Sequence, residues 1–363
     1  MRRFPPSRSR VGRWALRISS FALSLLLVYS MMQLLLPGGA SLAHAQFASV
    51  APFAGAFDPL TPTAGTTTTS SPTDTPTATV TDTPTATSTP SVTPSATPSP
   101  SQLPHYDHVV VVIEENKDFT QVIGSGTPDP YINSLASQGM LFTNSHATTH
   151  PSQPNYLDLF SGSDQGVVGD VCDSNAPYAG PDLGGQLISA NLTFAGYAEN
   201  LPSAGFTGCS GSNGLYVRKH TPWAVFSDTN GAATNLPFSS FPTSSAGYST
   251  LPTVSFVTPN MQDDMHDGSI SQADSWLQQN LDGYAQWAKT NNSLLIVTWD
   301  ENDQSSGVVS NQIATIFEGQ HVQVGTNNTN ISHYDVLRTL EDMYGLPPAN
   351  NAANASDITG IWN

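Results

Sequence analysis

The chain has 363 residues, enough for one large domain or two smaller ones, and its 28 acidic against 11 basic residues give a net charge of −17. A surface this acidic repels polyanions and gains nothing from counterion release, which argues against nucleic acid as a partner. With 28 Gly, 28 Pro and 2 Cys spread without a period, a coiled coil, a collagen and a disulfide-dense miniprotein are also excluded.

The first 45 residues have the order of a secretory signal peptide. Six of the eleven basic residues lie within the first 17 positions, an apolar run follows over about 21–36, and small residues end the segment at Ala45. We expect cleavage after Ala45. The alternative is an uncleaved membrane anchor, although the apolar run is short for a bilayer span, which needs roughly 20 residues. The segment predicts an exported protein, secreted or at the cell surface, with a bacterial-type signal.

Residues 46–104 form a predicted disordered linker. From about 61 to 101 they consist mainly of Thr, Pro, Ser and Ala in a loose TPTAT/TPSAT repeat. Such a composition offers almost no large apolar side chain to bury, and proline keeps it extended. The linker is either a stalk that tethers the following domain to a membrane or cell wall, or a tail without a role of its own.

Residues 105–363 alternate between strand and helix patterns, with an apolar core of their own. Four β-branched or apolar runs are typical of buried strands: 108–113, 253–258, 294–298 and 312–317. Three stretches have helical patterns: 130–137, 271–289 and 332–344. The alternation predicts an α/β domain with a mostly parallel central sheet covered by helices on both faces. Ligand sites of such sheets lie beyond the carboxyl ends of the strands.

Two of the predicted strands end in acidic residues. Glu115 and Asn116 follow the first strand, and Asp300 and Glu301 follow the third. For a single carboxylate a solvated loop position is the alternative, but acidic pairs that converge at one edge of a sheet repel each other unless a cation holds them. Oxygen ligands suit Mg, Ca or Mn, and added imidazole suits Zn or Fe. The pattern therefore predicts a divalent metal site.

The segment around Ser152 contains a candidate nucleophile. A helix that begins directly after Ser152 places its hydroxyl beside backbone N–H donors, where an anion is favoured. The alternative is that Ser152 only caps the helix, and spacing does not choose between the two. Elsewhere Cys172 and Cys209, the two cysteines of an exported chain, predict one structural disulfide.

Six segments in the right order resemble the phosphoesterase family that joins acid phosphatases with phosphatidylcholine-type phospholipases C, within the alkaline-phosphatase-like superfamily. They are VVVVIEENKDFTQVIG at 109–124, THPSQPNYLDLFSG at 149–162, YVRKHTPWAVF at 216–226, VTPNMQDDMHDGSI at 257–270, VTWDEND at 297–303 and SHYDVLRTLEDMYGLP at 332–347. Together they cover nearly all of 105–347. The resemblance implies an alkaline-phosphatase-like fold for this domain.

The resemblance also implies roles for individual residues. Glu115, Asn116, Asp300 and Glu301 match the family's metal ligands, and Ser152 stands where the superfamily keeps its nucleophile. His266 and His333 match histidines that hold a second cation in two-metal relatives. Gln262 stands where the family has a carboxylate before His266. One cation, with the histidines facing the phosphate, therefore fits the sequence as well as two cations do.

These parts suit phosphoryl transfer through a phosphoserine. A cation that lowers the pKa of Ser152 favours attack on phosphorus, and charge on the equatorial oxygens needs donors already in place. Lys219, His220, His266 and His333 are the candidate donors. A protonated histidine, His220 or His266, would donate to the leaving alcohol and favour an acidic optimum.

We therefore expect an exported, metal-dependent phosphoesterase of acid-phosphatase type. Its substrate is a small phosphate monoester or a phospholipid head group, and its cofactor is Mg, Mn, Ca or Zn. No extra carboxy-terminal β-domain of the kind found in longer phospholipases C is evident, which favours the monoesterase. The alternatives are a phospholipase C or other phosphodiesterase, which would need a lipid-tolerant apolar rim, and a surface-displayed binding protein without turnover.

Overall fold

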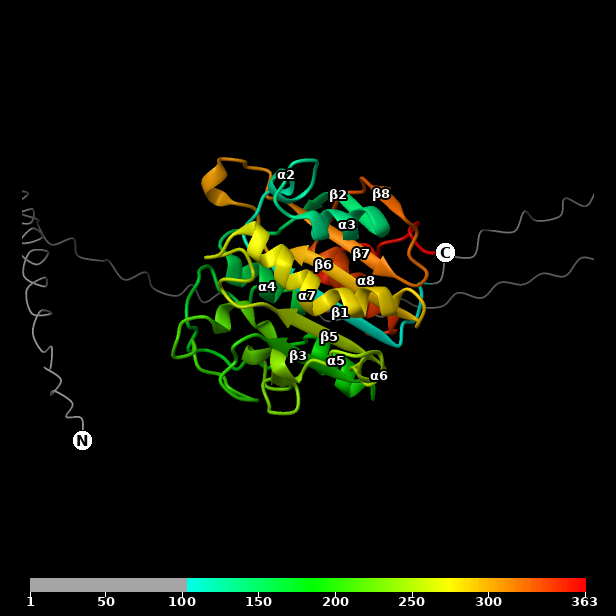
Figure 1. The fold of residues 1–363 in the computed structure, drawn as a ribbon. Coiled ribbons are helices and arrows are strands. Elements are labelled where there is room, and N and C mark those ends of the chain that lie inside the picture. The colour runs from blue at the N-terminus through cyan, green and yellow to red at the C-terminus, as the bar shows by residue number, and fades with distance from the viewer. Residues whose placement is uncertain (1–102) are drawn as a thin grey trace, which may run out of the picture. The chain divides into compact units, whose positions relative to one another are not determined.

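The computed structural model describes residues 103–363, which are built around one nine-stranded sheet (Figure 1). The predicted signal peptide and all but the last two residues of the predicted linker lie outside the described residues. The strand order is β4-β3-β5-β1-β6-β7-β2-β8, and β9 pairs with β2. The strands are β1 (His108–Glu114), β2 (Met140–His146), β3 (Phe194–Ala198), β4 (Asn235–Pro237), β5 (Val254–Thr258), β6 (Ser293–Trp299), β7 (Gln312–Gly319), β8 (Gly325–Asn327) and β9 (Ile331–Ser332).

The prediction of a mostly parallel α/β sheet is confirmed. β1 pairs in parallel with both β5 and β6, and β3 pairs in parallel with β4 and β5. β7 is the exception, because it runs antiparallel to both of its neighbours, β6 and β2. All four predicted strands are present as β1, β5, β6 and β7, while β2, β3 and the short strands β4, β8 and β9 were not predicted.

The central strands are buried on both faces, which explains their continuous apolar runs. In β1, Val109, Val111 and Ile113 belong to one hydrophobic core, and Val110 and Val112 belong to the other. Since successive side chains of a strand point to opposite faces, β1 contributes to both layers of the domain.

Helices cover both faces of the sheet (Figure 1). The helices are α2 (Phe119–Val122), α3 (Pro130–Gln138), α4 (Ser152–Ser161), α5 (Leu183–Ser189), α6 (Ser245–Tyr248), α7 (Ile270–Ala288) and α8 (His333–Met343). Buried residues of α3 and α7 join the core of one face, and those of α4, α5 and α8 join the core of the other. The three predicted helices correspond to α3, α7 and α8. None of the helices within residues 103–363 is long and apolar enough to cross a membrane.

The packing of β3 depends on a glycine. A Cβ at Gly196 would lie 2.0 Å from the ring of Trp223, which is fully buried against this strand. The short segment Phe194–Ala198 contains no β-branched residue. This absence explains why its pattern did not reveal a strand.

The predicted disulfide between Cys172 and Cys209 is confirmed, with 5.5 Å between the two Cα atoms. It connects the loop that follows α4 to the segment that leads into the short helix η1 (Arg218–His220). Arg218 strengthens the same connection, because its backbone N–H donates to the Cys209 carbonyl and its guanidinium donates to the Asp173 carbonyl.

Candidate active site

The carboxyl ends of β1 and β6 bring the two predicted acidic groups together. These strands are paired in register up to Glu114 and Trp299, so the residues that follow are neighbours at the edge of the sheet. The Asp300 backbone N–H donates to the Glu114 carbonyl at 2.9 Å, and the Asn116 backbone N–H donates to Asp300 Oδ1 at 3.0 Å. Asn116 turns the chain with a φ of 48°, a left-handed conformation that asparagine tolerates.

Ser152 faces these acids from the first turn of α4. Its Oγ lies 3.1 Å from Glu115 Oε2, 3.1 Å from Glu301 Oε1 and 3.4 Å from Asn116 Oδ1. The N-cap of the helix is Pro151, so the alternative that Ser152 is only a cap is wrong. The hydroxyl has one proton and can donate it to one of these three oxygens at a time. The other two oxygens therefore need a different donor or a cation.

The electrostatics of this cluster fit a divalent cation. Glu115, Asp300 and Glu301 are buried. Burial, together with the neighbouring charges of Asp300 and Asp264, raises the pKa of Glu115 well above its usual range. Burial and the charge of Glu301 raise the pKa of Asp300 in the same way, and burial raises the pKa of Glu301 to about 7. Asp300 Oδ2 has no hydrogen-bond partner among the described residues, and Glu115 Oε1 has only its contact with His220. An all-oxygen set with unpartnered buried carboxylate oxygens is what Mg, Ca or Mn requires.

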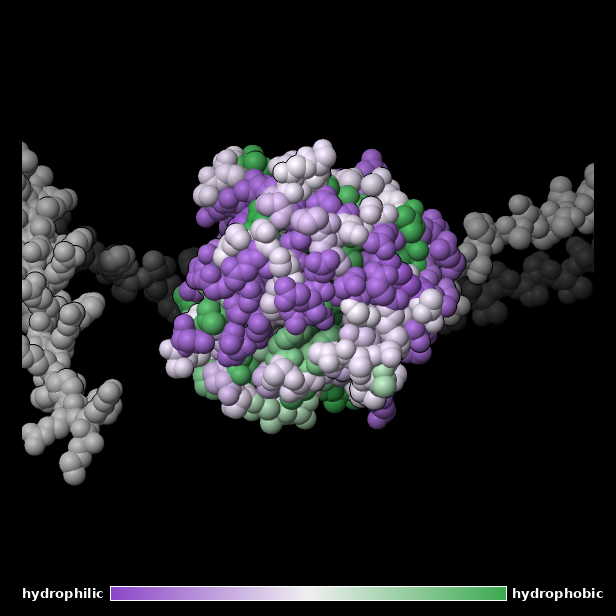
Figure 2. Space-filling model, viewed as in Figure 1, coloured by the Kyte–Doolittle hydropathy of each residue, from purple (hydrophilic) through white to green (hydrophobic). Residues whose placement is uncertain are grey.

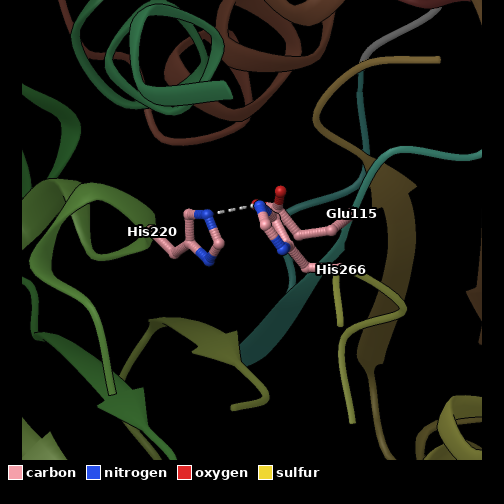
Figure 3. A group of neighbouring side chains, drawn as sticks. All are labelled: Glu115, His220 and His266. Carbon is pink, nitrogen blue, oxygen red and sulfur yellow. Dashed lines mark ion pairs between the residues drawn. The ribbon is translucent and has the colours of Figure 1, made fainter. Parts of the chain in front are cut away.

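A second group joins Glu115 to two predicted histidines, His220 and His266 (Figure 3). One nitrogen or oxygen atom from each of the three lies within 4.8 Å of the others. His220 Nε2 is 3.1 Å from Glu115 Oε1, and His220 Nδ1 is 3.3 Å from Asp264 Oδ2. The His220 ring stacks on Tyr156 at 5.1 Å. Burial lowers the pKa of His220 well below its usual range, which favours the neutral imidazole.

Lys219 brings a positive charge beside this group. Its Nζ pairs with Asp170 Oδ2 at 2.6 Å and lies 3.4 Å from His266 Nε2. The other carboxylate oxygen of Asp170 accepts the backbone N–H of Gln153, the residue after Ser152. The ammonium is therefore held close to the nucleophile candidate through Asp170.

His333 takes a different position from the one expected for a phosphate-facing histidine. It is buried, and its Nε2 donates to the backbone carbonyl of Asp300 at 2.7 Å. Burial lowers its pKa to about 4. In this arrangement the neutral ring of His333 orients the loop that carries Asp300.

Three residues of the site were not singled out from the sequence. Asp264 approaches His220, Asp170 holds Lys219, and His150 Nδ1 contacts Glu301 Oε2. His150 also lines a cavity of about 460 Å³ between the start of α4 and the loop that follows this helix. The sequence signals for these residues are weak, because His150 directly precedes a proline and Asp264 is one acid in a polar run.

The sheet order and the position of the site at its carboxyl edge are those of an α/β fold of the alkaline-phosphatase type. A solved protein of the alkaline phosphatase superfamily from Vibrio parahaemolyticus has this fold, with a TM-score of 0.50 and 13% identity over 70% of this chain and 74% of that chain. The lipoteichoic acid synthase LtaP from Listeria monocytogenes also has a TM-score of 0.50, with 11% identity over 71% of this chain and 77% of that chain. The chain belongs to the Phosphoesterase family, whose model matches residues 126–347.

Two relatives place the chain within this family. The phosphatidylinositol-3-phosphatase of Mycobacterium tuberculosis is 53% identical over 262 residues, covering 72% of this chain and 85% of the relative. The phosphate-repressible acid phosphatase of Penicillium chrysogenum is 31% identical over 277 residues, covering 71% of this chain and 65% of the relative. The resemblance seen in the sequence is thus confirmed, and the protein is a phosphoric ester hydrolase.

Proposed function

We propose that residues 105–363 hydrolyse phosphate monoesters through a phosphoserine formed on Ser152. The observation that carries this proposal is the convergence of Glu115, Asn116 and Glu301 on Ser152 Oγ, all within 3.4 Å. The names of the two relatives, a phosphatidylinositol-3-phosphatase and an acid phosphatase, support monoesters as the substrate class.

One divalent cation, Mg, Mn, Ca or Zn, would be held by Glu115, Asn116, Asp300 and Glu301. When bound, it supplies Lewis-acid chemistry that favours the Ser152 alkoxide over the hydroxyl. We assign His220 and His266 to the phosphate instead of a second cation, because Gln262 stands where two-metal relatives have a carboxylate.

Each of these residues has a separate role in the reaction. Ser152 Oγ gives its proton to the Glu301 carboxylate and forms a bond to phosphorus, while the bond to the leaving alcohol breaks. Lys219 and His220 donate to the equatorial oxygens of the phosphoryl group, where negative charge gathers. His266, whose side chain is 25% exposed, exchanges protons with solvent and protonates the leaving oxygen. Water then cleaves the phosphoserine, which releases phosphate and restores the serine hydroxyl.

The test follows p-nitrophenol release by the purified protein with Mg, Mn, Ca or Zn added in turn, between pH 4 and pH 9. The substrates are p-nitrophenyl phosphate and p-nitrophenylphosphorylcholine. The proposal expects turnover of the monoester that a chelator removes and the metal restores. Preference for the choline diester would overturn it in favour of a phospholipase C. Bound metal without turnover of either substrate would instead favour a binding protein.

Residues 1–45 and 46–104 are proposed to be an export signal and a linker. The disulfide between Cys172 and Cys209 supports export, because such bonds persist in oxidising compartments. Fractionation of the source cells, followed by amino-terminal sequencing, tests both assignments. A processed protein outside the membrane supports them, and an unprocessed cytoplasmic protein contradicts them.

A further inference from the structure

Exposed apolar side chains gather on two loops of the described part of the chain. Among residues 103–363, six large hydrophobic side chains are exposed, and four of them lie in the loops 163–173 and 303–311: Val168, Val171, Val308 and Val309. The other two, Ile188 and Val324, lie on α5 and next to β8. Single exposed hydrophobic residues are ordinary, but four of six on two loops are not a scattered set.

The two loops are built alike. Each contains Asp-Gln followed by Gly-Val-Val, at 164–168 in one loop and, after two inserted serines, at 303–309 in the other. Gly166 and Gly307 both take left-handed φ values, 78° and 77°, with open space around them. After each glycine turn the second valine points outward, so that Val168 is 85% exposed and Val309 is 98% exposed. We call these two turns the valine tips.

Both loops are anchored next to the candidate active site. In the first, Asp170 accepts the N–H of Gln153, and the N–H of Val171 donates to the Gln153 side chain at 2.9 Å. In the second, the Asn302 side chain donates to the Val308 carbonyl at 3.0 Å. Gln153 follows Ser152 and Asn302 follows Glu301, and the Ser152 hydroxyl lies 3.1 Å from the Glu301 carboxylate. Both valine tips are therefore attached to segments that adjoin the buried nucleophile.

A cavity lies between the first tip and His150, a residue that contacts the acidic cluster. Val168 and His150 line the same space of about 460 Å³, and the His150 ring contacts Glu301. The second tip belongs to the loop drawn in orange at the upper left of Figure 1, where Figure 2 shows hydrophobic colour at the surface.

We propose that the valine tips insert into a lipid surface and bring the active site to a phosphate monoester carried by a lipid head group. This inference rests on the proposed function and names its substrate class. Two separate, convex aliphatic tips suit a soft apolar surface, whereas a peptide ligand needs a continuous groove or a sheet edge. The domain is strongly acidic, so insertion of apolar side chains, and not charge attraction, provides the adhesion.

The experiment compares a lipid surface with soluble substrates of the same chemistry. The purified full chain is given p-nitrophenyl phosphate, a water-soluble short-chain phosphatidylinositol 3-phosphate, and phosphatidylcholine vesicles that contain the long-chain lipid. The double variant Val168→Ser and Val309→Ser is compared with Val324→Ser, a matched exposed valine outside the two loops. Vesicle binding is measured separately by flotation in the Ser152→Ala background, where turnover does not consume the lipid.

The double variant should lose about tenfold or more in vesicle binding and vesicle hydrolysis, because the two valine side chains that insert into the lipid are exchanged for polar ones. Its rates on both soluble substrates should stay within about twofold of the parent. Val324→Ser should match the parent throughout, and Val309→Trp should bind vesicles more tightly.

Unchanged vesicle binding in the double variant would overturn the proposal, as would a parent protein that hydrolyses the short-chain lipid but not the vesicles. An equal loss on all three substrates would overturn it too, since the loops would then serve only the site. If the parent hydrolyses none of the substrates with metal bound, the proposed function itself fails, and this inference fails with it.

Discussion

Ser152→Ala tests the proposed mechanism most directly. The hydroxyl has two carboxylate oxygens at 3.1 Å and is 1% exposed, but its single proton makes one hydrogen bond at a time. Loss of that bond costs roughly 1–3 kcal/mol, against roughly 5–15 kcal/mol for a whole domain, so the fold and the bound metal should persist. Without the nucleophile, kcat should fall by about 10⁴ or more.

The assay measures p-nitrophenyl phosphate hydrolysis, metal content and the thermal unfolding midpoint of the same samples. Ser145→Ala is the matched control, because Ser145 is equally buried but bonds Thr315 within the sheet at 2.8 Å. The control should keep its rate within about twofold. Acid quenching of the parent during turnover should leave a phosphoryl group on the peptide that contains Ser152. Residual activity of Ser152→Ala within tenfold of the parent, or a phosphoryl group on another residue, would refute the covalent mechanism.

Three further changes test the metal site, the packing and the pH dependence of stability. Asp300→Asn should lose metal and at least about a hundredfold in activity together, because one buried carboxylate charge disappears; full metal occupancy by elemental analysis would show that the ligand set is misplaced. Gly196→Ala forces a Cβ to within 2.0 Å of the Trp223 ring and should destabilise the fold by about 2–3 kcal/mol in urea unfolding, whereas Gly231→Ala, with open space around it, should change little. Burial raises the pKa of Glu341 from 4.5 to about 7, so the folded state holds the extra proton and stability falls as pH rises through this interval. The free energy of unfolding of Glu341→Gln, measured relative to the parent, should therefore be about 1–2 kcal/mol higher at pH 7.5 than at pH 4.5. An equal difference from the parent at both pH values would contradict the reasoning.

The central strands and the acids at their ends could be predicted because their signals are local. A strand buried on both faces has a continuous apolar sequence. The polar residues that follow it, such as Glu115 and Asp300, mark the carboxyl end of the strand, where ligand sites of parallel sheets lie. The antiparallel direction of β7 could not be predicted, because the same apolar run serves either direction when both faces are buried.

The residues that support the site depend on contacts between distant segments. Asp170 reaches Lys219 across 49 positions, and His150 reaches Glu301 across 151. No spacing rule connects such pairs, because the intervening chain length carries no information about where two loops meet. His333 shows the same limit: its match to a family motif did not reveal that its ring would orient the Asp300 carbonyl.

The disulfide divides the site into two parts, which we expect to respond differently to reducing agents. Glu115 and Asp300 are held by strand pairing at the sheet edge, so the oxygen cluster around them does not depend on the cystine. The loop with Val168 and Asp170 and the segment with Lys219 and His220 are the two pieces joined by Cys172 and Cys209. Reduction would loosen phosphate binding and lipid contact while metal binding persists. Under the proposed export and metal binding, a chain retained in a thiol-rich cytosol would keep its metal but capture substrate poorly, and its full activity would develop only after export.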